Sequence, residues 1–212
     1  MQSMKPDPEP NAISGLDKLW RDLAAAQPAA LSSDSLAAFR DGAYTVPFLD
    51  RSYRVDPEGR TIAGPEEDEL ARDPEFRLLI LGYLTGARGA DTSSESPRWV
   101  SERQLPGGSL FFQGPHALPV APLVRRFGTD AEGFRSACGS LGGTPLEYGD
   151  ASFGFLALPL VPLAVILWTA DEEFPARAGM LFDPSVSRHL ALDLVLALAR
   201  ATALRITAVH EV

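Results

Sequence analysis

The stretch FGFLALPLVPLAVILWTADEEFPARAGMLFD, residues Phe153–Asp183, decides the fold. Its first part, Phe153–Ala170, is uncharged and nearly as long as the roughly 20 apolar residues that a membrane-spanning helix needs. Pro159 and Pro162 interrupt it, and each would remove a helical hydrogen bond. The stretch therefore predicts buried strands and no membrane span. The expected strands are Phe153–Leu158, Leu163–Thr169 and Ala178–Phe182.

Alternating apolar residues separated by turns predict a small antiparallel meander before this stretch. Its expected strands are Tyr44–Leu49, Ser52–Val55 and Arg60–Ala63, with Asp50-Arg51 as the first turn. Apolar residues at helical spacing predict the helices. They are expected from Ser14 to Gln27, Ser33 to Gly42, Pro74 to Leu84, Val120 to Phe127, Asp130 to Leu141 and His189 to Leu204. The predicted class is α+β, with an antiparallel or mixed sheet made from the meander and the later strands and covered by helices mainly on one face.

The length and composition of the chain predict one folded domain. The 212 residues are 45% hydrophobic and 22% charged, which is ordinary for a globular protein. The segment Met1–Asn11 is polar, contains three prolines and lacks an apolar signal core. We therefore expect a flexible tail over residues 1–12 and a single α+β domain over residues 13–212.

Charge and cysteine content exclude several classes of protein. The formal net charge is −9, and no basic patch of the kind that binds a phosphate backbone is visible, so nucleic acid is not an expected partner. Cys138 is the single cysteine, which excludes an intrachain disulfide and a zinc or iron–sulfur site ligated by several cysteines of one chain. This fits a reducing compartment, and we expect a cytoplasmic protein. No motif identifies a cofactor.

Three segments together resemble a family of prokaryotic proteins, the Domain of Unknown Function 3786 family. They are Tyr44–Val55, Trp99–Gly108 and the series from Leu158 through Trp168 and Asp171-Glu172-Glu173-Phe174-Pro175 to Asp183. The resemblance covers roughly Leu16 to Ala203 and implies one domain without assigning catalytic residues. It also implies a setting in anaerobes, sometimes beside iron–sulfur modules, and any such link would run through a partner because this chain has no cysteine motif.

Four acidic residues form the first candidate site. Asp171, Glu172 and Glu173 follow one predicted strand, and Asp183 ends the next. Carboxylates gathered at strand ends could bind Mg²⁺ or Ca²⁺ through oxygen ligands or perform acid–base chemistry. The alternative is a solvated turn, with Asp183 capping a helix that begins at Pro184. If the two strands are antiparallel neighbours, Asp171 and Asp183 need not lie at the same end.

Basic and aromatic residues form the second set of candidates. Arg98, Trp99 and Arg103, beside Gly107-Gly108, could bind an anion or carboxylate, or they could form a plain turn with a structural Arg–Glu pair. His116 could face a cleft, although the histidines lack metal-ligand spacing and a structural role is the alternative. Trp168 could line an apolar ligand cavity, or simply pack in the core.

These residues support two hypotheses of different classes. The first is a non-catalytic accessory domain that binds a ligand or a protein partner, with a link to anaerobic metalloenzyme or cofactor metabolism that the resemblance implies. The second is a metal-dependent enzyme that uses the four carboxylates, with Arg103 holding an anionic small molecule. A third possibility is a structural domain that forms oligomers through an exposed apolar patch.

Overall fold

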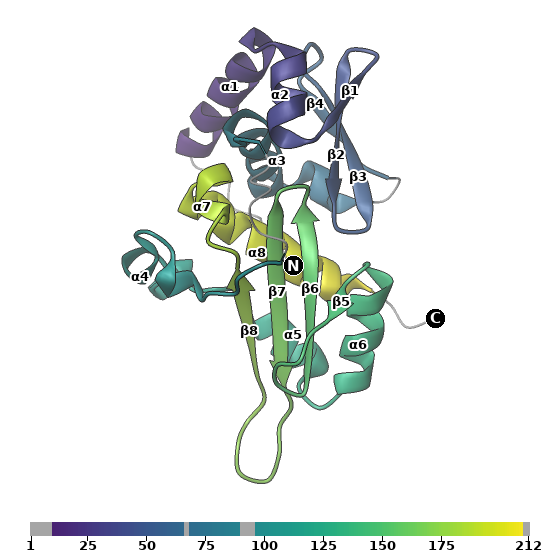
Figure 1. Cartoon of the computed structure of the whole chain (residues 1–212), viewed down its shortest axis with the longest axis vertical. Coiled ribbons are helices and arrows are strands. Elements are labelled where there is room, and N and C mark those ends of the chain that lie inside the picture. The colour runs from purple at the N-terminus through teal and green to yellow at the C-terminus, as the bar shows by residue number, and fades with distance from the viewer. Residues whose placement is uncertain (1–9, 66–67, 90–95, 210–212) are drawn as a thin grey trace, which may run out of the picture.

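The strands form two separate antiparallel sheets. In the computed structural model, which describes residues 10–65, 68–89 and 96–209, each sheet has four strands in sequential order (Figure 1). The first sheet contains β1 (Ala38–Arg40), β2 (Ala43–Phe48), β3 (Arg51–Asp56) and β4 (Thr61–Ala63). The second contains β5 (Thr144–Pro145), β6 (Ala151–Leu158), β7 (Val161–Trp168) and β8 (Arg177–Phe182). The α+β class is confirmed, but the prediction of one sheet is wrong, because strand pairing between distant segments leaves no periodic signal in the sequence.

The apolar stretch folds as the β6–β7 hairpin. The ladder pairs Ala151 with Leu167 at its open end and Leu158 with Val161 beside the turn. An irregularity between Leu156 and Leu158 leaves Ala157 without a partner in this ladder. The irregularity lies beside Pro162, and proline is found in strands mainly at bulges and edges. Within the described ranges, no helix is both long and apolar enough to cross a membrane.

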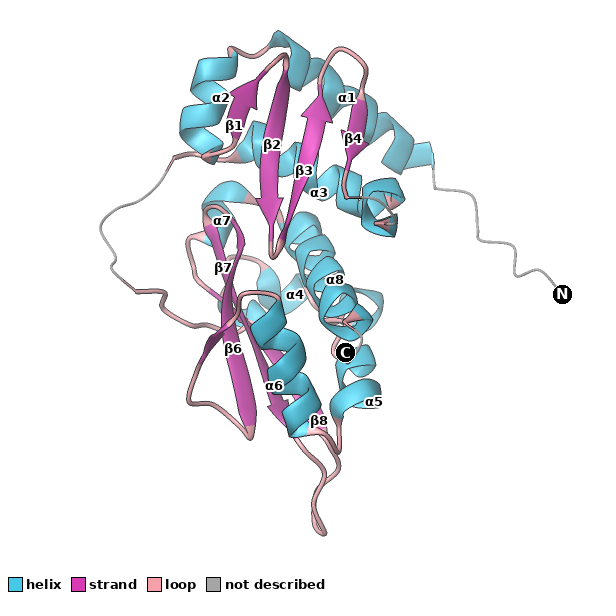
Figure 2. Cartoon of the chain, turned by 90° about the vertical axis from the view of Figure 1, so that its right-hand side faces the viewer, coloured by secondary structure: helices cyan, strands magenta, loops and turns pink. Residues whose placement is uncertain are grey.

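The helices divide between the two sheets, as Figure 2 shows. Three longer helices lie against the first sheet: α1 (Pro10–Ala25), α2 (Pro28–Ser35) and α3 (Pro74–Gly86). Three others accompany the second sheet: α5 (Ala121–Phe127), α6 (Ala131–Ser140) and α8 (Leu192–Ala208). The short helical turns are η1 (Glu69–Arg72), η2 (Glu102–Gln104), α4 (Gly108–Phe111), η3 (Gly114–His116) and α7 (Val186–His189).

Three predicted helices differ clearly from the observed ones. The second helix runs over Pro28–Ser35 rather than from Ser33 to Gly42, because Pro28 occupies its first turn and Leu36 adopts a left-handed conformation with φ of 57° that ends it. The last helix is interrupted at Leu190, which is extended, so α7 precedes a separate α8. Helix α1 begins at Pro10, inside the segment assigned to the tail, and residues 1–9 lie outside the described ranges.

A single buried core joins the two halves, and α3 and α8 meet at its centre. Gly82 of α3 allows this close approach. A Cβ at this position would lie 2.4 Å from Leu194 Cδ1 of α8. Because both helices are largely buried, their contact fixes the position of the second half against the first.

The tip of the β2–β3 hairpin also joins the two sheets. The Leu49 N–H donates a hydrogen bond to Ala157 O over 3.1 Å. Ala157 is the residue without a partner in the β6–β7 ladder, so the bulge supplies a carbonyl that can accept from another segment. Leu49 has φ of 51°, which is uncommon for a leucine. The tip is therefore held in a strained conformation that brings the next residue, Asp50, towards α8.

Candidate binding site

A buried arginine joins α8 to the hairpin tip. Arg205 is only 8% exposed, and its Nη2 atom donates to both carboxylate oxygens of Asp50, at 2.8 and 2.9 Å. Its Nε atom is buried and has no hydrogen-bond partner among the described residues. A buried guanidinium of this kind depends strongly on its carboxylate partner, because removal of that partner would leave the charge uncompensated.

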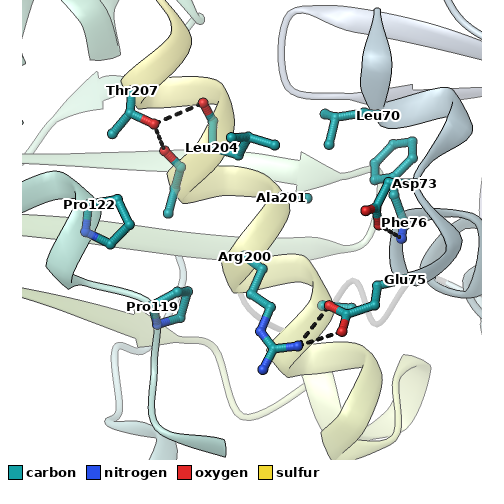
Figure 3. Close-up of a pocket in the computed structure, with 12 residues that line it drawn as sticks. Leu70, Asp73, Glu75, Phe76, Pro119, Pro122, Arg200, Ala201, Leu204 and Thr207 are labelled. Atoms are coloured by element: carbon teal, nitrogen blue, oxygen red, sulfur yellow. Dashed lines mark hydrogen bonds and ion pairs between the residues drawn. The ribbon is translucent and has the colours of Figure 1, made fainter. Parts of the chain in front are cut away.

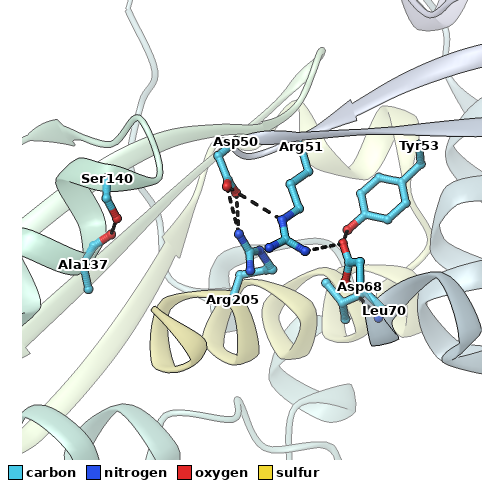
Figure 4. A network of polar contacts seen from close by, with 8 residues as sticks. All are labelled: Asp50, Arg51, Tyr53, Asp68, Leu70, Ala137, Ser140 and Arg205. Carbon is cyan, nitrogen blue, oxygen red and sulfur yellow. Dashed lines mark hydrogen bonds and ion pairs between the residues drawn. The ribbon is translucent and has the colours of Figure 1, made fainter. Parts of the chain in front are cut away.

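The arginine belongs to a larger group, the polar cross-link, which consists of Asp50, Arg51, Tyr53, Asp68 and Arg205 (Figure 4). Arg51 Nη1 lies 2.9 Å from Asp68 Oδ2, and Tyr53 donates its hydroxyl to the same oxygen over 2.5 Å. Asp68 also accepts from Leu70 N and thereby caps η1. The cross-link thus ties β3, η1 and α8 together.

The electrostatics of the cross-link favour a fixed protonation state. Burial alone would raise the pKa of Asp68, but hydrogen bonds from Tyr53, Arg51 and Leu70 N lower this pKa below its usual value. Burial, followed by the hydrogen bond to Asp68, raises the pKa of Tyr53 well above its usual value. Tyr53 therefore stays a neutral donor and Asp68 a charged acceptor near neutral pH, which suits a structural group rather than a proton-transfer site.

A hollow of about 370 Å³ lies on α8 and is bounded by η1, by the start of α3 and by the segment before α5 (Figure 3). Two aspartate caps shape one wall. Asp68 caps η1, which presents Leu70, and the Asp73 carboxylate accepts from Phe76 N over 2.9 Å to cap α3. The residues that line this α3–α8 hollow are Leu70, Asp73, Glu75, Phe76, Pro119, Pro122, Ala197, Arg200, Ala201, Ala203, Leu204 and Thr207.

Small residues on α8 create the hollow. Ala197 and Ala201 stand one helical turn apart on the same face, and their methyl groups leave space that larger side chains would fill. Leu204, one turn further, is 54% exposed and extends the apolar surface. Pro119 and Pro122 form part of the opposite wall and contribute no backbone N–H donors. The hollow is therefore mainly apolar.

An ion pair closes one end of the hollow. Arg200 Nη1 of α8 lies 2.6 and 2.8 Å from the two carboxylate oxygens of Glu75 on α3. The side chains are 40% and 52% exposed, respectively, so the pair lies at the rim and is weaker than the buried Arg205 contact. Figure 3 shows the two side chains facing each other. An apolar hollow with one charged end can bind an amphipathic small molecule.

The four predicted acidic residues are not brought together. Asp171, Glu172 and Glu173 lie in the exposed loop after β7, and Asp183 follows β8. Because β7 and β8 are antiparallel, with Trp168 opposite Arg177 and Leu163 opposite Phe182, the two groups lie at opposite ends of the ladder, about 20 Å apart. A joint site of these four carboxylates is therefore excluded by the strand pairing. Within the described ranges, no group of three or more His, Cys, Asp or Glu residues could hold a metal ion.

Each of the two aspartates instead accepts hydrogen bonds from backbone N–H groups. Asp171 Oδ1 accepts from the N–H groups of Glu173 and Phe174, at 2.8 and 2.7 Å. Asp183 accepts from Ser185 N and, over 2.7 Å, from Arg98 N. Burial alone would raise the pKa of Asp183, but these hydrogen bonds and the Arg98 charge lower it. The Asp171 carboxylate organises a turn, and the Asp183 carboxylate also joins Arg98 to the segment after β8.

The predicted basic and aromatic candidates occupy separate places. Trp99 is partly buried against Gly154 of β6, while the Arg103 side chain is 75% exposed and lies 3.7 Å from Glu102. His116 is exposed and stacks on Phe111, with the ring centroids 4.7 Å apart. Trp168 is covered by the Arg177 guanidinium, 4.3 Å from the ring centroid. None of these residues lines the α3–α8 hollow.

Cys138 lies buried in α6. Burial raises the pKa of its thiol well above the usual value. The thiolate that would be needed for metal binding or nucleophilic attack is therefore disfavoured.

The predicted site residues include no residue of the polar cross-link and none that lines the hollow. The sequence predicts a turn at Asp50-Arg51, and Arg205 lies just beyond the predicted end of the last helix, at Leu204. The available signal was the arginine itself, a long charged side chain following an Ala/Leu-rich helix.

The family model described as Domain of unknown function (DUF3786) matches residues 27–205 of the chain. This chain belongs to that family. The match confirms the predicted resemblance, and it spans both sheets, α3 and most of α8, the two helices that bound the hollow. No curated protein and no solved structure matches the chain.

Proposed function

We propose that this DUF3786 chain is a non-catalytic accessory domain, and that a small, mainly apolar molecule binds in its α3–α8 hollow. The observation that carries the proposal is the hollow itself. Its volume of about 370 Å³ is within the usual range of small-molecule sites, and most of its lining residues are apolar. The carboxylate-cluster enzyme, the other function considered, draws no support from the separated positions of Asp171 and Asp183.

The accessory role adds a protein partner to the proposal. Family resemblance implies a setting beside iron–sulfur modules, and the buried Cys138 leaves any cluster to that partner. Leu110 supports a contact surface, since its side chain is 83% exposed on α4, which stands away from the second sheet (Figure 1).

Native purification without oxygen tests the proposal. Native mass spectrometry of the intact chain should show a bound small molecule, and solvent extraction should release it. The Ala201→Phe variant should lose that molecule, because the phenyl ring would occupy the hollow. The matched control is Ala24→Phe, at an exposed position of α1, which should retain it.

The two variants also separate binding from folding. Both should keep the circular dichroism spectrum of the wild-type chain and a cooperative melting transition. Recovery of a wild-type chain with no bound molecule would contradict the proposal, as would retention of the molecule by a folded Ala201→Phe variant. A partner protein that contacts α4 should co-purify with both the Ala201→Phe and the Ala24→Phe variants.

A further inference from the structure

The charged end of the hollow has one ion pair that a ligand could exchange. Asp73 is committed to the α3 backbone, and the Thr207 hydroxyl donates to Ala203 O and Leu204 O, at 2.9 and 3.1 Å. Arg200 and Glu75, by contrast, contact each other through two flexible side chains at the rim. A ligand could therefore replace Glu75 on Arg200, or Arg200 on Glu75, without breaking a helix cap.

Arg200 also has donors beyond those that Glu75 uses. Both contacts to Glu75 come from Nη1, whereas among the described residues Nη2 reaches only Pro115 O, at 3.5 Å. A guanidinium has five N–H donors arranged as a fork that fits a carboxylate with two parallel hydrogen bonds. Glu75 therefore occupies a carboxylate position on Arg200 without using the whole fork.

Building on the proposed binding role, we propose that the ligand of the hollow carries a carboxylate that takes the place of Glu75 on Arg200. The displaced Glu75 would remain in solvent beside the first turn of α3, where the helix dipole favours a negative charge. A cationic head group would fit less well. Paired with Glu75, it would leave Arg200 without its carboxylate and would itself lie near the positive end of α3.

The length of the hollow defines the rest of the ligand. From Arg200 to Thr207, α8 rises by about 10 Å, at roughly 1.5 Å per residue. The exposed Leu204, with Ala201 and Ala203, lines this distance. A medium-chain fatty acid such as octanoate has a suitable length, with its carboxylate at Arg200 and its hydrocarbon chain along α8. The ligand class is therefore a small aliphatic carboxylate.

The test compares three probes with the same chain and different heads: octanoate, 1-octanol and octylamine. Isothermal titration of the delipidated wild-type chain should give the tightest binding for octanoate. The Arg200→Gln variant should bind octanoate about tenfold more weakly, a change typical of losing one charge-assisted contact, and should bind 1-octanol nearly as well as wild type. Glu75→Gln should bind octanoate several-fold more tightly than wild type, because a competing carboxylate is removed.

The control variant is Arg135→Gln, on α6 and away from the residues that line the hollow, which should bind all three probes like wild type. Equal binding of octanoate and 1-octanol by wild type and Arg200→Gln would overturn the carboxylate assignment and leave the proposed apolar binding role intact. Preference for octylamine would have the same meaning. Failure of all three probes to bind a folded, delipidated chain would overturn both proposals.

Discussion

The polar cross-link and the acidic loop at Asp171–Glu173 are both groups of charged residues next to strands, yet their surroundings differ. In the cross-link, the side chain of Asp68 is only 4% exposed and accepts hydrogen bonds from Tyr53, Arg51 and the η1 backbone. In the loop, Asp171 accepts two hydrogen bonds from neighbouring backbone groups, and the three acidic residues are exposed. One group connects distant segments, while the other completes a local turn.

The difference shows where charge carries structural information in this chain. A row of acidic residues after a strand is conspicuous in the sequence, but water already solvates it and little depends on each charge. A single arginine buried on an apolar helix is less conspicuous. Its removal nevertheless leaves the carboxylate that it binds without a partner. The consequences of mutation should therefore be largest in the cross-link and smallest in the loop.

The largest effect is expected for Arg205→Met. This change removes the buried partner of Asp50 while keeping much of the side-chain volume, and it should lower the free energy of unfolding by about 2–4 kcal/mol. The estimate lies at the lower part of the range for buried pairs because the Asp50 side chain is 30% exposed. Urea denaturation monitored by circular dichroism measures it.

An exposed ion pair supplies the matched control. Lys18 and Asp22 form an i,i+4 pair on α1 with side chains that are 69% and 45% exposed, so Lys18→Met should change the free energy of unfolding by less than about 0.5 kcal/mol. Asp50→Ala combined with Arg205→Met should be less destabilising than the sum of the single changes. Strict additivity would show that the two side chains do not interact.

The second effect depends on pH. Asp68→Asn should lower the free energy of unfolding by about 1–3 kcal/mol at pH 7, because a charged acceptor of buried donors is lost. In the wild-type chain the folded-state pKa of Asp68 is depressed, so its contribution is complete above its ordinary pKa and is lost as the pH falls through the folded-state value.

The gap in stability between the wild-type chain and Asp68→Asn should therefore narrow as the pH is lowered from 7 towards about 3, below the ordinary Asp pKa. Denaturation curves at a series of pH values measure this gap. A gap that stays constant over that range would show that Asp68 is not held ionised by Tyr53 and Arg51.

Local signals in the sequence predicted the elements well, and distant pairings poorly. The prolines at 159 and 162 divide the apolar run into β6 and β7, and Pro74 marks the start of α3, because proline restricts the backbone wherever it occurs. The separation into two sheets depends instead on which strands pair, and the sequence pattern of each strand is the same in either arrangement. The prediction of where the second helix ends is wrong because Leu36 adopts a left-handed conformation that leucine rarely takes.

The candidate site was harder to predict for the same reason. Asp50 and Arg205 are 155 positions apart, and Glu75 and Arg200 are 125 positions apart, so no motif links either pair. The hollow results from the absence of large side chains on one face of α8, where alanines line it. Alanine is also the residue that favours helices most. A sequence cannot distinguish an alanine chosen for helix formation from one that leaves space for a ligand.

The smallest effect is expected in the acidic loop, where the three acidic residues should also differ from one another. The double change Glu172→Gln and Glu173→Gln should leave the free energy of unfolding within about 0.5 kcal/mol of wild type, because both side chains are solvated. Asp171→Ala should lower it by about 0.5–1.5 kcal/mol, since two backbone N–H groups lose their acceptor. Thermal melts with and without millimolar Ca²⁺ or Mg²⁺ complete the test. If these cations raise the melting temperature of wild type but not of the double variant, the loop is a cation site and the contrast with the polar cross-link fails.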